Sequence, residues 1–425
     1  MKTRTISSLQ DSGLPWAPMV PRDWEVLALK HVVELRSGNA ITAEQIGEAG
    51  DYPVFGGNGL RGFTSCFTHD GAFPLIGRQG ALCGNINYAT GRFYASEHAV
   101  VATPKRACAI RWLGELLRVM NLGQYSVSAA QPGIAVEAIK ELKIPVPPPS
   151  EQTAIAAFLD RETAKIDALV EEQRRLIALL AEKRQAVISH AVTKGLDPTV
   201  PMKDSGVEWL GEVPAHWEVA RLKHISPEIT VGIVVEPSKY YMEHGVPALR
   251  SLNVRQGRID TDNLVFISPD SNKSLRKSRL SAGDLVSVRT GQPGTTAVIP
   301  PNLDGCNCID LIIIRRPIEG DENYLSWYLA SDVAVRQFAD GSGGAIQQHF
   351  NVSVAGDLVV CVPSLPEQTK IAKFVVMETQ KIDNLIAEAQ SATNLLQERR
   401  AALISAAVTG KIDVRGLVPA VEEAA

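Results

Sequence analysis

The chain has 425 residues, of which 45% are hydrophobic and 21% charged, a composition typical of a globular protein large enough for two or three domains. Its formal net charge of -4 argues against a uniformly basic nucleic-acid binder, although basic faces can occur locally on an acidic body. The sequence has no apolar run long enough to span a membrane, and its start, MKTRTISSLQDSG, lacks the hydrophobic core of a signal peptide, so we expect a cytoplasmic protein with no membrane partner.

Residues 11–31, DSGLPWAPMVPRDWEVLALKH, precede a region (32–142) with mixed strand, turn and helix signals. YPVFGGNGLRGF, residues 52–63, predicts two short strands around a Gly-Gly-Asn-Gly turn, because glycine and asparagine accept positive φ. Residues 74–89 and 98–104 predict further strands, and residues 110–121 predict a helix. A phosphate-cradling loop is the weaker interpretation of the glycine-rich turn, since no helix follows it at once.

Residues 151–195 predict one long helix, because no proline or glycine lies between Gln152 and Lys194 and a proline-rich stop precedes the segment. Some 40 residues at about 1.5 Å each would form a rod of roughly 60 Å. Apolar residues recur at alternating spacings of three and four, namely Ile155, Leu159, Ile166, Leu169, Leu176, Leu180 and Val187, with Glu162, Gln173 and Lys183 as polar interruptions. This pattern is typical of an imperfect coiled-coil seam, which needs a partner helix.

The chain then repeats itself. Residues 204–224, DSGVEWLGEVPAHWEVARLKH, align without a gap with residues 11–31 at an offset of 193. A second mixed region (225–358) follows, with strands predicted within 246–260, 283–300 and 310–317 and a helix over 323–339. This insert does not align with the first and is longer by 23 residues.

The partner helix is the chain's own C-terminal copy of the first. EQTKIAKFVVMETQKIDNL, from Glu367, matches EQTAIAAFLDRETAKIDAL, from Glu151, at an offset of 216. Its predicted seam comprises Ile371, Val375, Ile382, Leu385, Leu396 and Leu403, with Glu378 as the matched interruption, and Ser364 with Glu367 suggests a capping box. We predict that the two helices pair antiparallel, with one mixed region at each end and a near two-fold relation between the halves.

Catalytic signatures are missing from the sequence. It contains no G-x-x-x-x-G-K-[ST] loop, no H-E-x-x-H, no G-x-S-x-G and no Asn- or Asp-Pro-Pro-aromatic motif. The six cysteines are scattered, and a single C-x-C (Cys306 and Cys308) is poor zinc spacing, so we expect plain thiols and no metal site. His98 could donate to a base or a phosphate, but a structural role is the more common one for such a histidine.

Loop side chains suited to DNA occur in both inserts. Arg, Asn and Gln can each bond two atoms of one base edge, and glycines beside them permit close approach. The first insert offers Asn58, Arg61, Arg78, Gln79 and Gln131. The second offers Arg250, Asn253, Arg255, Arg289, Gln292, Gln347 and Gln348, while Lys273, Arg276, Lys277 and Arg279 suit phosphates. Each residue alone is more often solvated or structural, so the argument rests on two such sets in a duplicated frame.

The predicted rod would hold the two inserts on the order of a DNA helical turn or more apart, since a turn is about 34–36 Å. Two different inserts would then read two different half-sites across an unread gap. The repeated frame would serve assembly, and the divergent inserts would serve discrimination.

The sequence resembles the specificity (S) subunit of type I restriction-modification systems over nearly its whole length. The resemblance is carried by KDSGVEWLGEVPAHWEV, residues 203–219, with its N-terminal copy, and by the twin P-x-x-x-E-Q-T-x-I-A stretches at residues 147–156 and 363–372, each followed by K-I-D. YPVFGGNGLRGF with LIGRQGA, and LSAGDLVSVRTGQPGTTAV, look like parts of the family's target recognition domains. In the first frame copy, Ala17-Pro18-Met19 stands where the second has Leu210-Gly211-Glu212.

The resemblance implies a mixed α/β (α+β) protein in which two target recognition domains are joined by two long helices. The expected boundaries are 1–150 for the first domain with its frame segment, 151–195 for the central helix, 196–366 for the linker and second domain, and 367–425 for the C-terminal helix and tail. The family's S subunit is non-catalytic and binds double-stranded DNA, two modification (methyltransferase) subunits and the restriction subunits. S-adenosylmethionine, Mg²⁺ and ATP would belong to those partners.

Two other classes remain open at this stage. One is a self-contained restriction or methyltransferase enzyme, which would need the catalytic motifs missing above. The other is a coiled-coil scaffold whose inserts bind protein, which a test of binding to labelled duplex DNA would distinguish.

Overall fold

The computed structural model describes residues 2–4, 8–126, 132–290, 294–341 and 351–417. It has a mixed α/β fold that divides into two compact units, Met1–Gln173 with Ser391–Ala425 and Arg174–Gln390. Each unit contains one insert and parts of both long helices, α3 (Pro149–Lys194) and α8 (Leu365–Val408).

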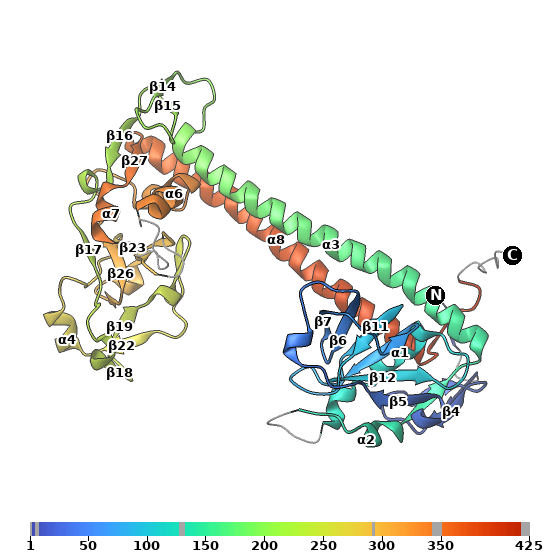
Figure 1. Ribbon diagram of the computed structural model, residues 1–425. Helices are drawn as coiled ribbons and strands as arrows, with labels where there is room; N and C mark the ends of the chain where they lie inside the picture. The colour runs from blue at the N-terminus through green and yellow to red at the C-terminus, as the bar shows by residue number, and fades with distance from the viewer. Residues whose placement is uncertain (1, 5–7, 127–131, 291–293, 342–350, 418–425) are drawn as a thin grey trace. The chain divides into compact units, whose positions relative to one another are not determined.

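The two long helices lie side by side and run antiparallel, as predicted (Figure 1). In the first unit, the start of α3 shares a buried cluster with the end of α8, through Ile155 and Val408. In the second unit, the end of α3 packs on the start of α8, through Val192 and Ile371. The interface between the helices therefore uses the same pairs of repeat positions in both units.

The phase of the seam differs from the prediction. Leu169 and Leu385 were assigned to it, but they are 50% and 48% exposed, and Leu176 is 43% exposed. The inward positions on α3 are Ile155, Leu159, Thr163, Ile166, Val170, Gln173, Ile177, Leu180, Arg184 and Ile188, and their copies at an offset of 216 face inward on α8.

The cause of this difference is the helical period. From Ile155 to Ile188 the inward face covers nine turns in 33 residues, or about 3.67 residues per turn, an 11-residue repeat rather than the heptad of the prediction. A prediction that advances 3.5 residues per turn falls behind an inward face that advances about 3.67. After several turns the predicted position is therefore one residue too early, at a leucine beside the true contact residue. The predicted interruptions at Glu162 and Glu378 disappear, because the buried residues are Thr163 and Thr379, both 3% exposed.

Two matched ion pairs fix the register of the helix pair. Arg400 Nε lies 2.8 Å from Asp167 Oδ1 in the first unit, and Arg184 Nε lies 2.8 Å from Asp383 Oδ1 in the second. Glu162 and Glu378 instead bond lysines one turn along their own helices, with Lys165 Nζ 3.0 Å from Glu162 Oε1.

The repeated frame motifs anchor the start of each long helix. The indole Nε1 of Trp24 donates to Glu151 (3.0 Å), and that of Trp217 donates to Glu367 (3.0 Å). The carboxylate of Glu367 also bonds His216, so it serves the frame rather than the predicted capping box.

The glutamine that follows each of these glutamates ties the helix start to the insert. Gln152 Nε2 donates to Pro147 O and its Oε1 accepts from Ala109 N, just before α1 (Ile110–Val119). Gln368 makes the same two bonds, to Pro363 O and from Asp321 N, the N-cap of α5 (Glu322–Leu329). The E-Q-T motif is thus the joint between frame, insert and helix.

Short antiparallel pairs complete the frame, and they repeat at the expected offsets. They are β2 (Leu9–Asp11) with β3 (Met19–Pro21), β14 (Met202–Asp204) with β15 (Glu212–Pro214), β4 (Glu25–Ala28) with β13 (Lys143–Val146), and β16 (Glu218–Arg221) with β27 (Val359–Val362). The β2–β3 register matches that of β14–β15, so the weaker N-terminal copy follows the frame in full. β1 (Lys2–Thr3) pairs with β28 (Ile412–Asp413), which joins the two ends of the chain in the first unit.

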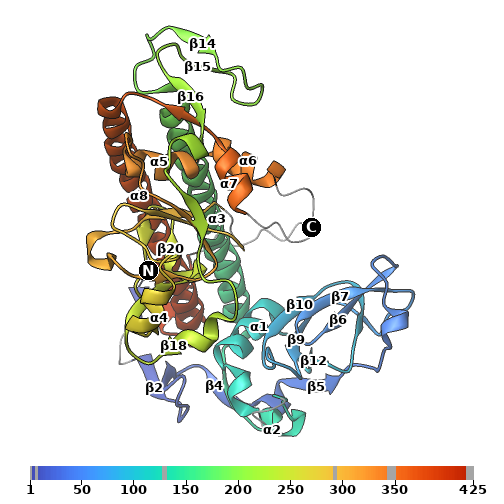
Figure 2. The same ribbon diagram turned by 90° about the vertical axis from the view of Figure 1, so that its left-hand side faces the viewer.

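The first insert contains two four-stranded sheets within the described residues. One has the order β10 (Ile86–Ala89), β9 (Phe73–Gly77), β12 (Ala99–Pro104), β5 (Val33–Ser37). The other has the order β7 (Gly59–Thr64), β6 (Tyr52–Gly56), β11 (Arg92–Ala95), β8 (His69–Asp70). Helix α1 packs on β9 and β10 (Figure 2).

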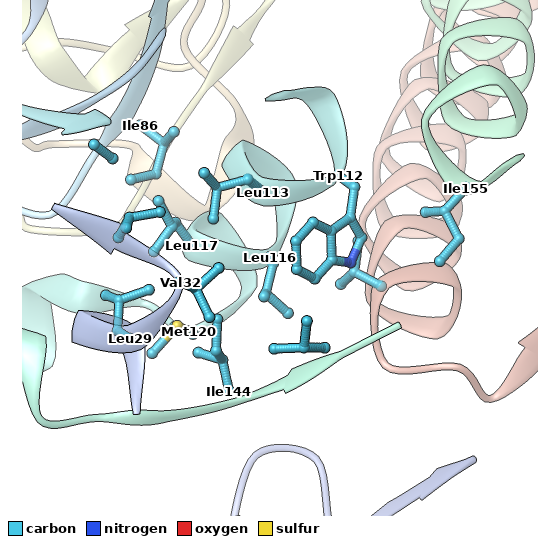
Figure 3. Packing of buried hydrophobic residues seen from close by; sticks show 14 of the residues in the cluster. Leu29, Val32, Ile86, Trp112, Leu113, Leu116, Leu117, Met120, Ile144 and Ile155 are labelled. Carbon is cyan, nitrogen blue, oxygen red and sulfur yellow. The ribbon is translucent and has the colours of Figure 1, made fainter. Parts of the chain in front are cut away.

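The core of the first unit joins insert, frame and helices. Trp112 of α1 is fully buried and lies on the side of α1 that faces Ile155 of α3, whereas Leu117 points toward Ile86 of the sheet (Figure 3). The short helix α2 (Val136–Lys140) adds Ile139 to this cluster.

One sheet of the second insert has the same strand order as in the first, and the other sheet shares three strands, although the two sequences do not align. The order β24 (Thr296–Val298), β23 (Leu285–Val288), β26 (Leu311–Ile314), β17 (Ile229–Val231) corresponds to β10-β9-β12-β5. The second sheet has the order β18 (Tyr241–Met242), β22 (Val265–Ile267), β19 (Val246–Leu249), β25 (Asn307–Cys308), in which β22-β19-β25 matches β7-β6-β11. The remaining elements are the hairpin β20 (Val254–Arg255) with β21 (Arg258–Ile259) and the helices α4 (Pro269–Ser274), α6 (Asp332–Gly341) and α7 (Val352–Asp357).

A glycine at the equivalent position of each insert supports this correspondence. Gly38 follows β5, and a Cβ on it would lie 2.1 Å from Ala95 O. Gly232 follows β17, and a Cβ on it would lie 2.6 Å from Cys308 O. Neither position has room for a side chain, because the chain crosses the end of the parallel strand pair at this point.

The helix predicted over 323–339 is two helices, α5 and α6. Ala330 caps α5, and the Ser331 hydroxyl accepts a bond from Ala334 N at the start of α6. Ser-Asp at 331–332 is a helix-start signal, which here outweighs the continuous apolar pattern.

Candidate nucleic-acid interface

Three loops of the first insert meet at one edge. β6 and β11 run parallel, with Ala95 opposite Phe55, so their carboxyl ends lie together. Gly77, the last residue of β9, is opposite Ala99, the first of β12. The loops that begin at residues 57, 78 and 96 therefore share this edge.

An open hollow of about 930 Å³ lies between these loops, lined by residues 57–61, 79–81, 98, 132 and 133. Three of the predicted DNA-binding residues, Asn58, Arg61 and Gln79, line it together, and all three are exposed. His98 lines it as well, with its side chain 39% exposed and its Nε2 3.2 Å from Glu97 Oε1.

Arg78 is half-buried at the base of this edge. Its N–H donates to His98 O (2.8 Å), and its carbonyl accepts from Ile134 N (2.9 Å). Gln131 lies outside the described residues.

The glycine-rich turn is a tight turn, as predicted, and it brings polar groups to the hollow. Gly59 has φ +96, and a Cβ there would lie 3.2 Å from Asn87 Oδ1. Asn85 donates to Asn58 (3.5 Å), and Asn87 Nδ2 is buried without a hydrogen-bond partner. Neither Asn85 nor Asn87 was predicted, since both lie within residues 74–89, which were predicted as strand, although Gly84 directly precedes Asn85.

The second insert presents the corresponding edge. β19 and β25 run parallel, and Val288, the last residue of β23, is opposite Leu311, the first of β26. Arg289 therefore occupies the position of Arg78, and Asp310 occupies that of His98. Arg250 is the first residue after β19, at the place of Gly57 in the first insert.

Not every predicted residue of the second insert is available for contact. Asn253 is 0% exposed, and its amide bonds Arg250 N, Asp260 O and Asp262 O, so its role in the chain is to hold its own loop. Its sequence neighbours gave no sign of this burial. Gln292, Gln347 and Gln348 lie outside the described residues.

The other arginines of this edge have backbone or carboxylate partners. Arg250 Nη2 donates to Asn263 O (2.6 Å), and Arg255, exposed on β20, has Nε 3.9 Å from Asp260 Oδ2. A separate hollow of about 540 Å³ in this insert is lined by none of the predicted residues.

The predicted phosphate cluster is exposed. Lys273 lies in the last turn of α4, whose N-cap Ser268 accepts from Ser271 N, and Arg276, Lys277 and Arg279 follow it. The carbonyls of Lys277 and Arg279 accept bonds from Arg315, which fixes the backbone that carries these cations.

Within the described residues, no group of three or more His, Cys, Asp or Glu side chains could hold a metal ion. The six cysteines are free thiols, and burial raises the pKa of Cys306 to about 12, so its thiol stays protonated at neutral pH. None of the described helices combines the length and apolarity that crossing a membrane requires.

Comparison with known proteins points to one family. Residues 21–177 match the model of the type I restriction modification DNA specificity domain. The chain is 44% identical over 150 residues to the type I restriction enzyme EcoprrI specificity subunit of Escherichia coli, an alignment that covers 34% of this chain and 37% of that subunit. It is 22% identical over 431 residues to the MjaVIII specificity subunit of Methanocaldococcus jannaschii, which covers 94% and 95% of the two chains.

Solved structures share the fold. A chain from a study of complex assembly and conformational transition of the type I R-M system superposes with a TM-score of 0.65 at 17% identity, over 92% of this chain and 99% of that one. The HsdS subunit from Thermoanaerobacter tengcongensis gives a TM-score of 0.50 at 15% identity, over 92% and 98%.

Proposed function

Because this chain belongs to the family of type I restriction-modification specificity subunits, we propose that it is the DNA-recognition subunit of such a complex. Each insert reads one half of a bipartite double-stranded target, and the paired helices dock modification subunits. The chain itself is non-catalytic. S-adenosylmethionine, Mg²⁺ and ATP act in the modification and restriction subunits.

The observation that carries this proposal is the shared edge of the two inserts. Arg78 follows β9 in the first insert, and Arg289 follows β23, the equivalent strand of the equivalent sheet in the second insert. The sequences of these two segments do not align. A common scaffold with different loop side chains is what two readers of two different half-sites require, because base edges are discriminated by the loop residues and not by the sheet.

Local charge supports DNA as the ligand of these edges. The net charge of -4 is spread over the whole chain, yet the cluster of Lys273, Arg276, Lys277 and Arg279 is exposed on one short segment. Cations of this kind bind phosphates without sequence preference and hold the reader in register.

The exposed leucines of the helix pair support docking of a partner protein. Leu169, Leu176 and Leu179 on α3, and Leu385 and Leu395 on α8, are 43–61% exposed. Each directly precedes an inward-facing residue of its own helix, so within each unit the leucines of α3 and α8 fall on the same side of the antiparallel pair. The ion pairs of Asp167 and Asp383 lie on the opposite flank, since each aspartate directly follows an inward residue.

Exposing these leucine side chains to water costs free energy, and burial against a partner protein removes that cost. The partner proposed here is the modification subunit. The repeat places Leu169 of the first unit and Leu385 of the second at the same position of the frame, which suits two copies of one partner.

Methylome sequencing of cells with and without this gene tests the function directly. The expected result is loss of methylation at one bipartite motif, with a fixed gap between its halves. Replacement of residues 32–142 by another insert should change only one half of that motif. Methylation of the motif that persists after deletion of the gene would contradict the proposal. So would a complex of the full chain with modification subunits that binds no duplex carrying the motif. In either case a coiled-coil scaffold whose inserts bind protein would be the better account.

A further inference from the structure

The position shared by Arg78 and His98 in the first insert carries a different pair in the second. Arg289 follows β23 and Asp310 precedes β26, and these strand ends are opposite one another. Arg289 Nη1 lies 2.9 Å from Asp310 Oδ1. We propose that Arg289 and Asp310 form a base-reading unit of the second insert, in which Asp310 is a positioning residue that aims the Arg289 fork at a guanine. This inference rests on the proposed function.

The backbone at Asp310 is the first independent observation. Its φ is +50, in the left-handed region that only a few per cent of non-glycine residues adopt. The Ile309 N–H bonds Leu249 O and the Asp310 N–H bonds Ile233 O, so the surrounding sheet holds this conformation. The backbone of Asp310 is therefore fixed at the strand end, and the ion pair with Arg289 holds its carboxylate.

The state of Arg289 is the second observation. Its side chain is 26% exposed, and its Nε is buried without a hydrogen-bond partner, while Asp310 holds Nη1. One side of the guanidinium is therefore occupied by the carboxylate, which leaves the other end of the fork for a ligand. Two parallel N–H bonds to O6 and N7 make guanine the base that a guanidinium held in this way reads best.

The corresponding pair in the first insert differs in charge. His98 takes the place of Asp310 and bonds Glu97 (Nε2 to Oε1, 3.2 Å), and Arg78 contacts His98 through its backbone N–H. The same site on the same scaffold therefore holds an arginine oriented by a carboxylate in one insert and an arginine beside a histidine in the other. A difference at this position is what discrimination between two half-sites requires.

The test uses the full chain assembled with its modification subunits and duplexes in which each base pair of the second half-site is replaced in turn. Asp310→Asn keeps the shape and tolerates the positive φ, and Asp310→Gly relieves the backbone strain. Both variants should lower discrimination at one G·C pair by about 10-fold or more, while the affinity for unrelated DNA stays the same or rises because a negative charge is lost. Arg289→Lys should have the same effect on that base pair. In an Arg289→Ala background, Asp310→Asn should change nothing further.

Asp357→Asn is the matched control, since Asp357 forms ion pairs of similar length with Arg221 (3.0 Å) and Lys223 (2.8 Å) in the frame. It should leave discrimination unchanged. A lower melting temperature for the Asp310 variants with full discrimination would overturn the proposal, as would equal loss of specific and non-specific affinity. If the wild-type complex itself recognises no motif, the failure lies with the proposed function and not with this pair.

Discussion

The clearest prediction compares the two anchors of the long helices. Glu151 and Arg4 have side chains that are 4% and 5% exposed and form a direct ion pair, and Glu151 also accepts from Trp24. At the matched position, Glu367 is 27% exposed and pairs with His216, which is 50% exposed. The same motif residue therefore holds a buried charge in one unit and a solvated one in the other.

Glu151→Gln preserves an oxygen for the indole but removes the charge that faces Arg4. The guanidinium is then left with Asp23 Oδ1 at 3.8 Å and Asp413 Oδ1 at 3.9 Å. Breaking one side of a buried pair costs about 3–5 kcal/mol, and we expect about 2–3 kcal/mol here because the indole bond remains. Glu367→Gln should cost less than about 1 kcal/mol, as for an exposed pair.

Hydrogen exchange of the full chain, followed by mass spectrometry, measures both effects. In Glu151→Gln, the amides of β4 and β28 should exchange roughly 30- to 150-fold faster, since about 1.4 kcal/mol corresponds to tenfold. In Glu367→Gln, the amides of β16 and β27 should change less than about fivefold. Equal effects at the two positions, or a larger effect at Glu367, would refute the reasoning from burial.

Three further predictions follow from other parts of the chain. Leu169→Ser should change the free energy of unfolding by less than about 0.5 kcal/mol but reduce co-purification of modification subunits. Val170→Ser, in the seam, should lower the free energy of unfolding in urea by about 1–3 kcal/mol. A larger loss of stability for Leu169→Ser than for Val170→Ser would instead place Leu169 in the seam, as the heptad spacing predicts. The Arg415 side chain lowers the pKa of Asp413 to about 2, so its carboxylate stabilises the fold above the usual aspartate pKa and loses this effect as pH falls from about 4 to 2; the stability difference between wild type and Asp413→Asn, measured by urea unfolding at each pH, should shrink over that window and not grow. Gly38→Ala should destabilise the first insert by more than about 2 kcal/mol in thermal unfolding, because the added Cβ meets a backbone carbonyl, and an unchanged melting temperature would show that the crossing can relax.

The placement of some predicted DNA-contact residues follows from their immediate sequence neighbours, whereas that of others depends on residues further along the chain. Asn58 and Gln79 stand beside glycines in a turn, and such turn chemistry acts over a few residues, so their place on one hollow was predictable. Asn253 carries the same residue type but lies under its own loop, because its amide satisfies backbone groups seven and nine residues further along. Asn253 has no glycine beside it, so the turn signal of Asn58 does not apply to it, and its burial depends on bonds to the carbonyls of Asp260 and Asp262.

The seam illustrates the limit set by helical geometry. The sequence predicted both helices, their pairing and their direction, since two matched apolar stripes in one chain can bury each other only in a few ways. The choice between Leu169 and Val170 depends on whether the pair repeats every 7 or every 11 residues, since a difference of about 0.17 residues per turn amounts to more than half a residue after four turns. That choice is made by the packing of the two helices against each other.

The sequence by itself therefore determined the duplicated frame, because identical residues at fixed offsets make identical local contacts such as Trp24 with Glu151 and Trp217 with Glu367. Only the tertiary structure revealed that the two inserts share the strand order of one sheet and three strands of the other, because pairing between distant strands depends on backbone hydrogen bonds and general apolarity, which many sequences supply. It also placed Asp310 beside Arg289, 21 residues earlier in the chain, through the opposition of two strand ends that no sequence spacing predicts.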